Sequence, residues 1–134
     1  MVIECEDATS MVRAAQDSAA AEHCNVSIAV VDEAGQLLAF VRMDGASPAS
    51  AEMAIAKART AATGRRSTAS YESMLNEGRT SLATAPTLTC IEGGIPLQHA
   101  GEWLGAIGVS GVSSDRDAAI ALAGARLIAS AEVQ

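Results

Sequence analysis

Hydrophobic and polar residues recur along this chain with two spacings, one typical of helices and one typical of strands. From Ala8 to Glu22 apolar residues, most of them alanine, recur at helical spacing, and Asp7 or Thr9 is placed to cap the helix. In the stretch NVSIAVVD the apolar residues share one face at a period of two, which predicts a strand. The run QLLAFVRM follows after a short EAG turn and predicts the second strand of a hairpin.

Two more helices are predicted in the middle of the chain. The pair Ser47 and Pro48 is typical of an N-cap followed by proline at the first helical position. This helix should run to Gly64, because glycine commonly ends a helix. A shorter helix is predicted over Ser70–Asn76, ending at Gly78.

The last third of the chain predicts three strands and a final helix. After a loop that contains Pro86, the stretch TLTCIEGGIPLQHAGEWLGAIGVSG reads as a strand, a tight Gly-Gly turn, a short strand, a second turn and a third strand. A helix follows from Asp115 to about Ala131. The order α-β-β-α-α-β-β-β-α, with strands joined by hairpins, predicts an α/β fold: a central antiparallel sheet of about four or five strands flanked by helices. No linker divides the sequence, so residues 1–134 should form a single domain.

Composition narrows the classes of function. The net charge of −7 argues against nucleic acid as a partner. No apolar run is long enough to cross a membrane and the N-terminus lacks the pattern of a signal peptide, so we expect a cytoplasmic protein without a membrane partner. Cys5, Cys24 and Cys90 have the spacing of neither a disulfide framework nor a zinc site, and their roles stay open.

The basic residues are unevenly distributed. Five of the nine Lys and Arg residues lie between Lys57 and Arg79, where there are only two acidic residues. This segment, which contains Arg65 and Arg66, could attract a small anion. The alternative is that these side chains are solvated or pair with nearby acids.

The stretch LGAIGVSG places three small residues, Ala106, Gly108 and Ser110, on one face of a strand. A face without side-chain bulk lets a flat ligand approach, or it lets an alanine-rich helix pack closely. Both explanations remain open. In the following SSDRD, Ser114 and Asp117 have the spacing of a capping box and Asp115 favours a helix N-terminus, so we interpret these residues as caps and not as a phosphate loop.

Two polar pairs have a possible chemical role. Arg42 and Asp44 follow a strand in FVRMDGAS, where they form either a structural ion pair or an anion clamp beside an acid. Lys57 and Thr60 share one helix face in IAKARTA. A desolvated lysine can act as a base or bind an anion, whereas a lysine that reaches to the surface is only structural.

The remaining candidates are one acid and two histidines. Glu92 precedes Gly93 and Gly94, whose turn exposes backbone N–H groups. It is either a general acid or base, or a polar residue of a hairpin without a chemical role. His23 ends the first helix, where a cation is favoured, and it is also the better candidate for an axial haem ligand. His99 lies in a turn, and neither histidine has a partner at metal-ligand spacing.

Five motifs in order resemble the GlcG/HbpS family: VSIAVVDEAGQLLAFVRMDGA, AIAKARTAATGRRS, EGGIPL, LGAIGVSG and DRDAAIA. This family includes haem-binding proteins, the glycolate-operon protein and the C-terminal domain of PduO-type cobalamin adenosyltransferases. The resemblance covers residues 8 to about 130. It implies a profilin-like or sensor-domain-like sheet flanked by helices, and a homo-oligomer between a dimer and an octamer.

The resemblance also implies a function. It favours a haem- or tetrapyrrole-binding accessory protein with haem as cofactor, His23 as iron ligand and Arg65 or Arg66 as propionate partners. The alternatives are a non-catalytic interaction module and a small catabolic enzyme, an isomerase or lyase that transfers a proton on a carboxylate-bearing metabolite. In the enzyme, Arg42 would hold the carboxylate and Glu92 or Lys57 would be the acid or base.

Under the haem-binding and the enzyme hypotheses alike, the ligand is a small, anionic molecule in one concavity. The residues expected to meet there come from strand ends and the facing helix: Arg42, Asp44, Lys57, Thr60, Glu92, Gly93, Gly94 and Gly108.

Overall fold

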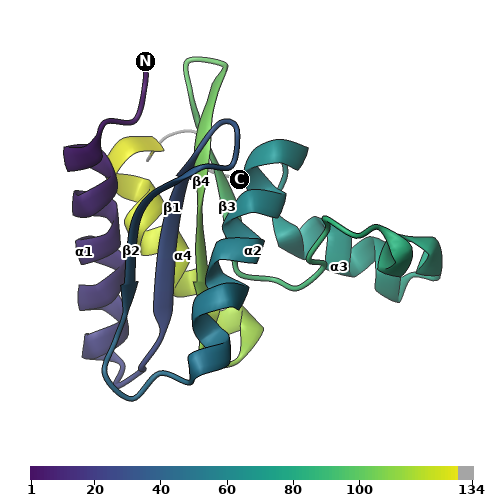
Figure 1. The fold of residues 1–134 in the computed structure, drawn as a ribbon, viewed down its shortest axis with the longest axis horizontal. Helices are drawn as coiled ribbons and strands as arrows, with labels where there is room; N and C mark the ends of the chain where they lie inside the picture. Colours follow the sequence, from purple (N-terminus) through teal and green to yellow (C-terminus); the bar gives the residue numbers. More distant parts are fainter. Residues whose placement is uncertain (130–134) are drawn as a thin grey trace.

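The computed structural model describes residues 1–129 and consists of one four-stranded antiparallel sheet with helices on both faces (Figure 1). The strand order is β2-β1-β4-β3. Helices α1 and α4 pack together on one face, and α2 packs on the other. The elements are α1 (Cys5–Ala21), β1 (Ser27–Asp32), β2 (Leu37–Arg42), α2 (Pro48–Gly64), α3 (Thr68–Asn76), the 3₁₀ helix η1 (Thr80–Thr84), β3 (Gly94–His99), β4 (Glu102–Ser110) and α4 (Ser114–Ala129).

The predicted fold class is confirmed, but the first of the three strands predicted after α3 is not formed. Residues 87–91 contain a turn and bends, and Gly94 is the first residue of β3 instead of part of a hairpin turn. The reason is that this segment bonds to a side chain of α2. The Thr60 hydroxyl accepts a hydrogen bond from Thr89 N at 3.0 Å and lies 3.5 Å from the carbonyl oxygen of Thr87.

The predicted helices form, but some of their caps and ends differ from the prediction. Helix α1 begins at Cys5, with Glu4 as N-cap and Asp7 as the reciprocal member of a capping box, so neither Asp7 nor Thr9 is the cap. Helix α2 begins at Pro48 as predicted and ends at Gly64, but the left-handed residue that follows is Arg65, with φ of 57°. Helix α3 begins two residues before the predicted start. The predicted end of the last helix at Ala131 lies outside the described residues.

The small-residue face of β4 is covered by α2. A Cβ atom placed on Gly108 would lie 2.6 Å from the backbone nitrogen of Ala58 and would collide with the carbonyl oxygen of Ala54. Both alanines are fully buried. Close helix packing, rather than a ligand, is therefore what the absence of side chains permits at this face.

A buried ion pair joins the layers at one end of the sheet. Lys57 Nζ of α2 lies 3.1 Å from Asp117 Oδ2 of α4 and donates to the carbonyl oxygen of Val109 in β4 at 3.0 Å. Each side chain of the pair is only 2% exposed. Asp117 also accepts a hydrogen bond from Val112 N at 3.2 Å, so it is a buried counter-ion as well as a residue of the first helical turn. Asp115 lies in the first turn of α4, as predicted, and is exposed.

Substitution of Gly108 by alanine should destabilise the fold. The added methyl group meets backbone atoms of α2, which cannot move aside without displacing the helix, so we expect a loss of about 2–3 kcal/mol in the free energy of unfolding. Gly64→Ala is the matched control, because its methyl group meets only the hydroxyl end of the Tyr71 side chain and alanine favours a helix. Urea unfolding measures both variants, and equal stability of the two would contradict close packing at Gly108.

Substitution of Lys57 by methionine should leave Asp117 as an unpaired buried carboxylate. We expect a loss of about 3–5 kcal/mol at pH 7, the usual cost of removing one partner of a buried pair. Burial raises the pKa of Asp117, and Lys57 opposes that shift, so the shift grows in the variant. A carboxyl whose folded pKa is raised binds a proton more tightly when folded, so the deficit should shrink as the pH falls through that pKa.

Two variants serve as controls for this measurement. Lys57→Met with Asp117→Asn should recover part of the lost stability, because no charge then remains buried. Glu102→Gln removes the exposed pair with the N-terminus, 3.1 Å long, and should cost less than about 1 kcal/mol. If Lys57→Met costs no more than Glu102→Gln, the ion pair does not stabilise the fold.

Candidate functional site

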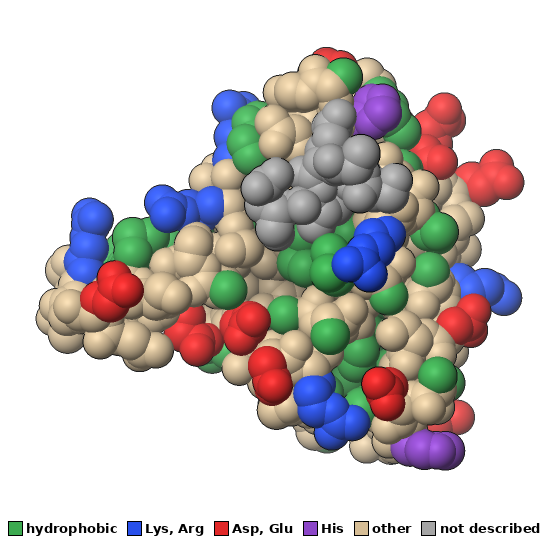
Figure 2. Space-filling model, turned by 180° about the vertical axis from the view of Figure 1, so that it is seen from behind, with side chains coloured by type: hydrophobic (Ala, Val, Ile, Leu, Met, Phe, Trp, Pro, Cys, Tyr) green, Lys and Arg blue, Asp and Glu red, His purple; other side chains and the backbone are tan. Residues whose placement is uncertain are grey.

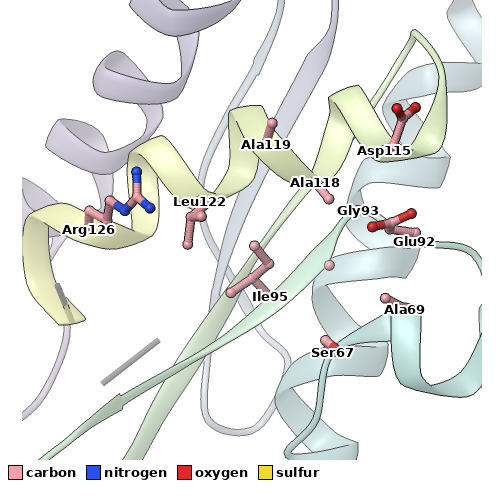
Figure 3. A pocket seen from close by; sticks show the side chains of 11 residues that line it. Ser67, Ala69, Glu92, Gly93, Ile95, Asp115, Ala118, Ala119, Leu122 and Arg126 are labelled. Atoms are coloured by element: carbon pink, nitrogen blue, oxygen red, sulfur yellow. The ribbon is translucent and has the colours of Figure 1, made fainter. Parts of the chain in front are cut away.

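A groove of about 430 Å³ lies between α4, the start of β3 and the first residues of α3 (Figure 3). Its floor is apolar, with Ile95 of β3 and Leu122 of α4 as the largest side chains. Figure 2 shows the same face of the molecule, where apolar side chains lie in a hollow beside several acidic side chains. The groove is lined by Ser67, Ala69, Glu92, Gly93, Gly94, Ile95, Asp115, Ala118, Ala119, Leu122 and Arg126.

Helix α4 contributes a continuous stripe of residues to this groove. Asp115, Ala118, Leu122 and Arg126 are spaced three or four residues apart and therefore share one face of the helix. The stripe is acidic at its start, apolar in its middle and basic at its end (Figure 3). The groove is consequently polarised along its length.

The acidic end contains two carboxylates. The pKa of Glu92 is raised by its partial burial and by the charges of Glu72 and Asp115, while Lys57 opposes the shift. A hydrogen bond with Ser113 lowers the pKa of Asp115. Glu72 also accepts a hydrogen bond from the backbone N–H of Glu92 at 2.8 Å, which fixes the segment that carries Glu92. This end of the groove therefore carries its acidic groups.

The paired glycines form the wall between the groove and the buried ion pair. Gly93 has φ of 134°, and a Cβ atom there would lie 2.7 Å from the carbonyl oxygen of Val109 and 2.8 Å from Lys57 Nζ. Gly94 N donates to the hydroxyl of buried Thr68 at 2.8 Å. Side chains at these positions would displace Lys57, so the pair serves close packing as well as lining the groove.

The structure brings some of the predicted site residues together. Glu92, Gly93 and Gly94 line the groove, and Lys57 lies directly behind Gly93. The ammonium group of Lys57 is buried and bonded to two acceptors, so it does not face the groove as a free base. Thr60 is buried and holds the segment of residues 87–89.

Other predicted residues lie elsewhere. Arg42 is at the end of β2, the sheet edge opposite β3, so three strand spacings of about 14 Å separate it from the groove. Asp44 lies in the turn after β2, and within residues 1–129 no ion pair joins it to Arg42. Gly108 is beneath α2 and His23 is in the turn between α1 and β1, so neither lines the groove.

Arg65 and Arg66 line a second, smaller cavity. It has a volume of about 210 Å³ and contains Trp103, and it meets the groove at Ser67. The guanidinium of Arg66 lies 5.2 Å from the ring centre of Tyr71, a cation–π distance. The two arginines therefore belong to the C-terminal end of α2 and not to the groove.

Sequence reasoning missed three residues that shape this region. Arg126 and Leu122 are part of the helical stripe of α4, and their spacing from Asp115 is a signal that could have identified them. Asp117 was interpreted only as a cap, and no local pattern connects it with Lys57, from which it is separated by 60 positions. Within residues 1–129 no three His, Cys, Asp or Glu side chains are grouped to hold a metal ion, and no helix is both long and apolar enough to span a bilayer.

Comparison with known proteins places the chain in a family. The family model described as haem degrading protein HbpS-like matches residues 3–126. Protein GlcG of Escherichia coli K12 is 46% identical over 110 residues, which are 82% of this chain and 82% of GlcG.

Solved structures agree with this relationship. A double mutant of Streptomyces reticuli HbpS is 35% identical to this chain with a TM-score of 0.88. The match covers 95% of this chain and 87% of the HbpS chain. The protein in the PduOC:heme complex is 25% identical to this chain with a TM-score of 0.88. The match covers 100% of this chain and 98% of the PduOC chain. The match over nearly the whole chain, the identity to GlcG and the shared fold together show that this protein belongs to the HbpS-like family.

Proposed function

We propose that this protein is a haem- or tetrapyrrole-binding accessory protein in which His23 ligates the iron. The family description and the haem complex of the similar PduOC structure support a ligand of this class. The observation from this chain that carries the proposal is that the His23 imidazole is exposed and makes no hydrogen bond with a polar group of the described residues. Its side chain is exposed in the turn after α1, and within residues 1–129 its imidazole makes no hydrogen bond or ion pair.

The backbone holds His23 in a defined place. Its φ is 56°, in the left-handed region, and its N–H donates to the carbonyl oxygen of Ala20 at 3.1 Å. The next residue, Cys24, is buried and its N–H donates to Ala19 O at 2.8 Å. An imidazole on such a fixed turn loses little backbone entropy when it binds iron.

The propionate partner in the same chain would be Arg116 and not Arg65 or Arg66. The turn between α1 and β1, which contains His23, lies at the end of the sheet where α2 begins (Figure 1), whereas Arg65 follows the last residue of α2. A helix of 17 residues is about 25 Å long, so His23 and Arg65 cannot both contact one haem in a single chain. The guanidinium of Arg116 instead contacts Cys24 Sγ at 2.9 Å, one residue from His23.

The surroundings of His23 fit an exposed, exchangeable haem. The cavity between Cys24 and Arg116 has a volume of only about 70 Å³, so the macrocycle would lie on the surface beside exposed alanines such as Ala20 and Ala119. Cavities that enclose small molecules have volumes of ~300–1,000 Å³. A single chain would therefore hold haem at its surface, which would suit transfer of haem more than permanent retention.

Titration of haemin should give a saturable Soret shift, and His23→Ala should weaken binding more than about tenfold, or ~1.4 kcal/mol. His99→Ala is the matched control, because His99 is the other exposed histidine and lies at the far end of β3. Iron-free protoporphyrin should bind wild type and His23→Ala equally, since it offers no iron to ligate. Absence of a saturable shift for wild type would refute haem binding, and equal binding of haemin by both variants would refute His23 as ligand.

We also propose that this protein assembles into a homo-oligomer, because a second copy would cover the face of the macrocycle that one chain leaves exposed. About half of the alanines of α1, α2 and α4 are buried within the chain, so the exposed ones, such as Ala20 and Ala119, would contribute to the contact. Light scattering at micromolar concentration should give a mass at least twice the 13.6 kDa of one chain. A monomeric mass with and without haemin would contradict this expectation.

A further inference from the structure

We propose that the groove between α4 and β3 is a second binding site, which takes a linear zwitterion with an ammonium group at Glu92 and Asp115 and a carboxylate at Arg126. The groove contains neither His23 nor Arg116, and it meets the proposed haem site at Ala119, which lines both. Three features of the groove support the assignment: opposite charges at its two ends, an apolar floor between them, and its length.

The two ends of the groove differ in charge. Glu92 and Asp115 lie together at the end where α4 begins, and Arg126 lies at the other end (Figure 3). Within residues 1–129 no ion pair neutralises any of these three side chains. A ligand that carries charges at both ends would satisfy both, and charge-assisted hydrogen bonds are the strongest polar contacts available here.

The acidic end favours a cation for a second reason. Partial burial, and after it the charges of Glu72 and Asp115, raise the pKa of Glu92, so the carboxylates also repel one another. A bound ammonium group would relieve this repulsion. The same charges disfavour the propionates of a tetrapyrrole at this end, which separates the ligand of the groove from haem.

The floor and length of the groove define the body of the ligand. Ile95, Ala118 and Leu122 offer only apolar atoms to the middle of the groove. Asp115 and Arg126 are 11 positions apart on α4, which corresponds to about 16 Å along the helix axis. A charge-assisted contact of about 3 Å at each end takes up part of this span and leaves roughly 10 Å for the ligand, the length of an extended chain of about eight carbons.

The probe for this site is 8-aminooctanoate, compared with octanoate and octylamine of equal chain length. Isothermal titration calorimetry measures the affinities, and ¹⁵N NMR shifts of the Gly93 and Gly94 amides identify the site. We expect 8-aminooctanoate to bind at least about tenfold more tightly than either singly charged probe, the contribution of one further charge-assisted hydrogen bond.

Two variants divide the site into its halves. Arg126→Gln should weaken 8-aminooctanoate and octanoate about tenfold and leave octylamine unchanged, whereas Glu92→Gln should weaken 8-aminooctanoate and octylamine and leave octanoate unchanged. Arg13→Gln is the matched control, because Arg13 is an exposed arginine of α1 that does not line the groove. His23→Ala should leave all three affinities unchanged, so the result is independent of haem binding.

Several outcomes would overturn the proposal. Octanoate binding as tightly as 8-aminooctanoate would indicate a fatty-acid site, and octylamine doing so would indicate a simple cation site. NMR shifts that avoid Gly93 and Gly94, or no binding of any probe at millimolar concentration, would show that the groove is not a site for this class of ligand.

Discussion

The buried ion pair between Lys57 and Asp117 is the interaction on which the rest of this structure depends. It connects α2 on one face of the sheet with α4 on the other, and it does so at the end of the sheet where β4 stops. Two charges that are 2% exposed stabilise a protein only when they are paired and hydrogen-bonded, and here Val109 and Val112 supply the further hydrogen bonds. The pair therefore fixes where α4 begins relative to the sheet.

The position of α4 in turn determines the groove. Because Asp117 is held by Lys57, the stripe from Asp115 to Arg126 lies opposite the start of β3. Gly93 lets the backbone pass within contact distance of Lys57, which brings Glu92 to the acidic end. Gly93, which has no side chain, thus separates the buried charge of Lys57 from the charge of Glu92 in the groove.

The two proposed sites use different parts of one scaffold. His23 depends on the turn that links α1 to β1, whereas the groove depends on α4 and the edge strand β3. The charge of each site suits a different ligand. The two proposed sites meet on α4, which carries Arg116 beside the one and Arg126 in the other.

The sequence by itself determined the local features of this protein. The apolar periods identified the helices and the hairpin, Ser47 and Pro48 marked the start of α2, and the family motifs implied the sheet flanked by helices. These features follow from interactions between residues close in sequence, which spacing and composition record directly. The segment of residues 87–91 is the exception, because its strand-like pattern was overridden by hydrogen bonds to Thr60.

Only the tertiary structure decided which polar residues meet. The strand order β2-β1-β4-β3 puts Arg42 and Glu92 at opposite edges of the sheet. In the sequence the two look alike, because Arg42 ends a strand and Glu92 comes just before one. Asp117 looked like a cap because its partner is 60 positions away, and the bare face of β4 could not reveal whether a helix or a ligand covers it. Contacts of this range depend on how the layers pack, and a local pattern carries no record of that packing.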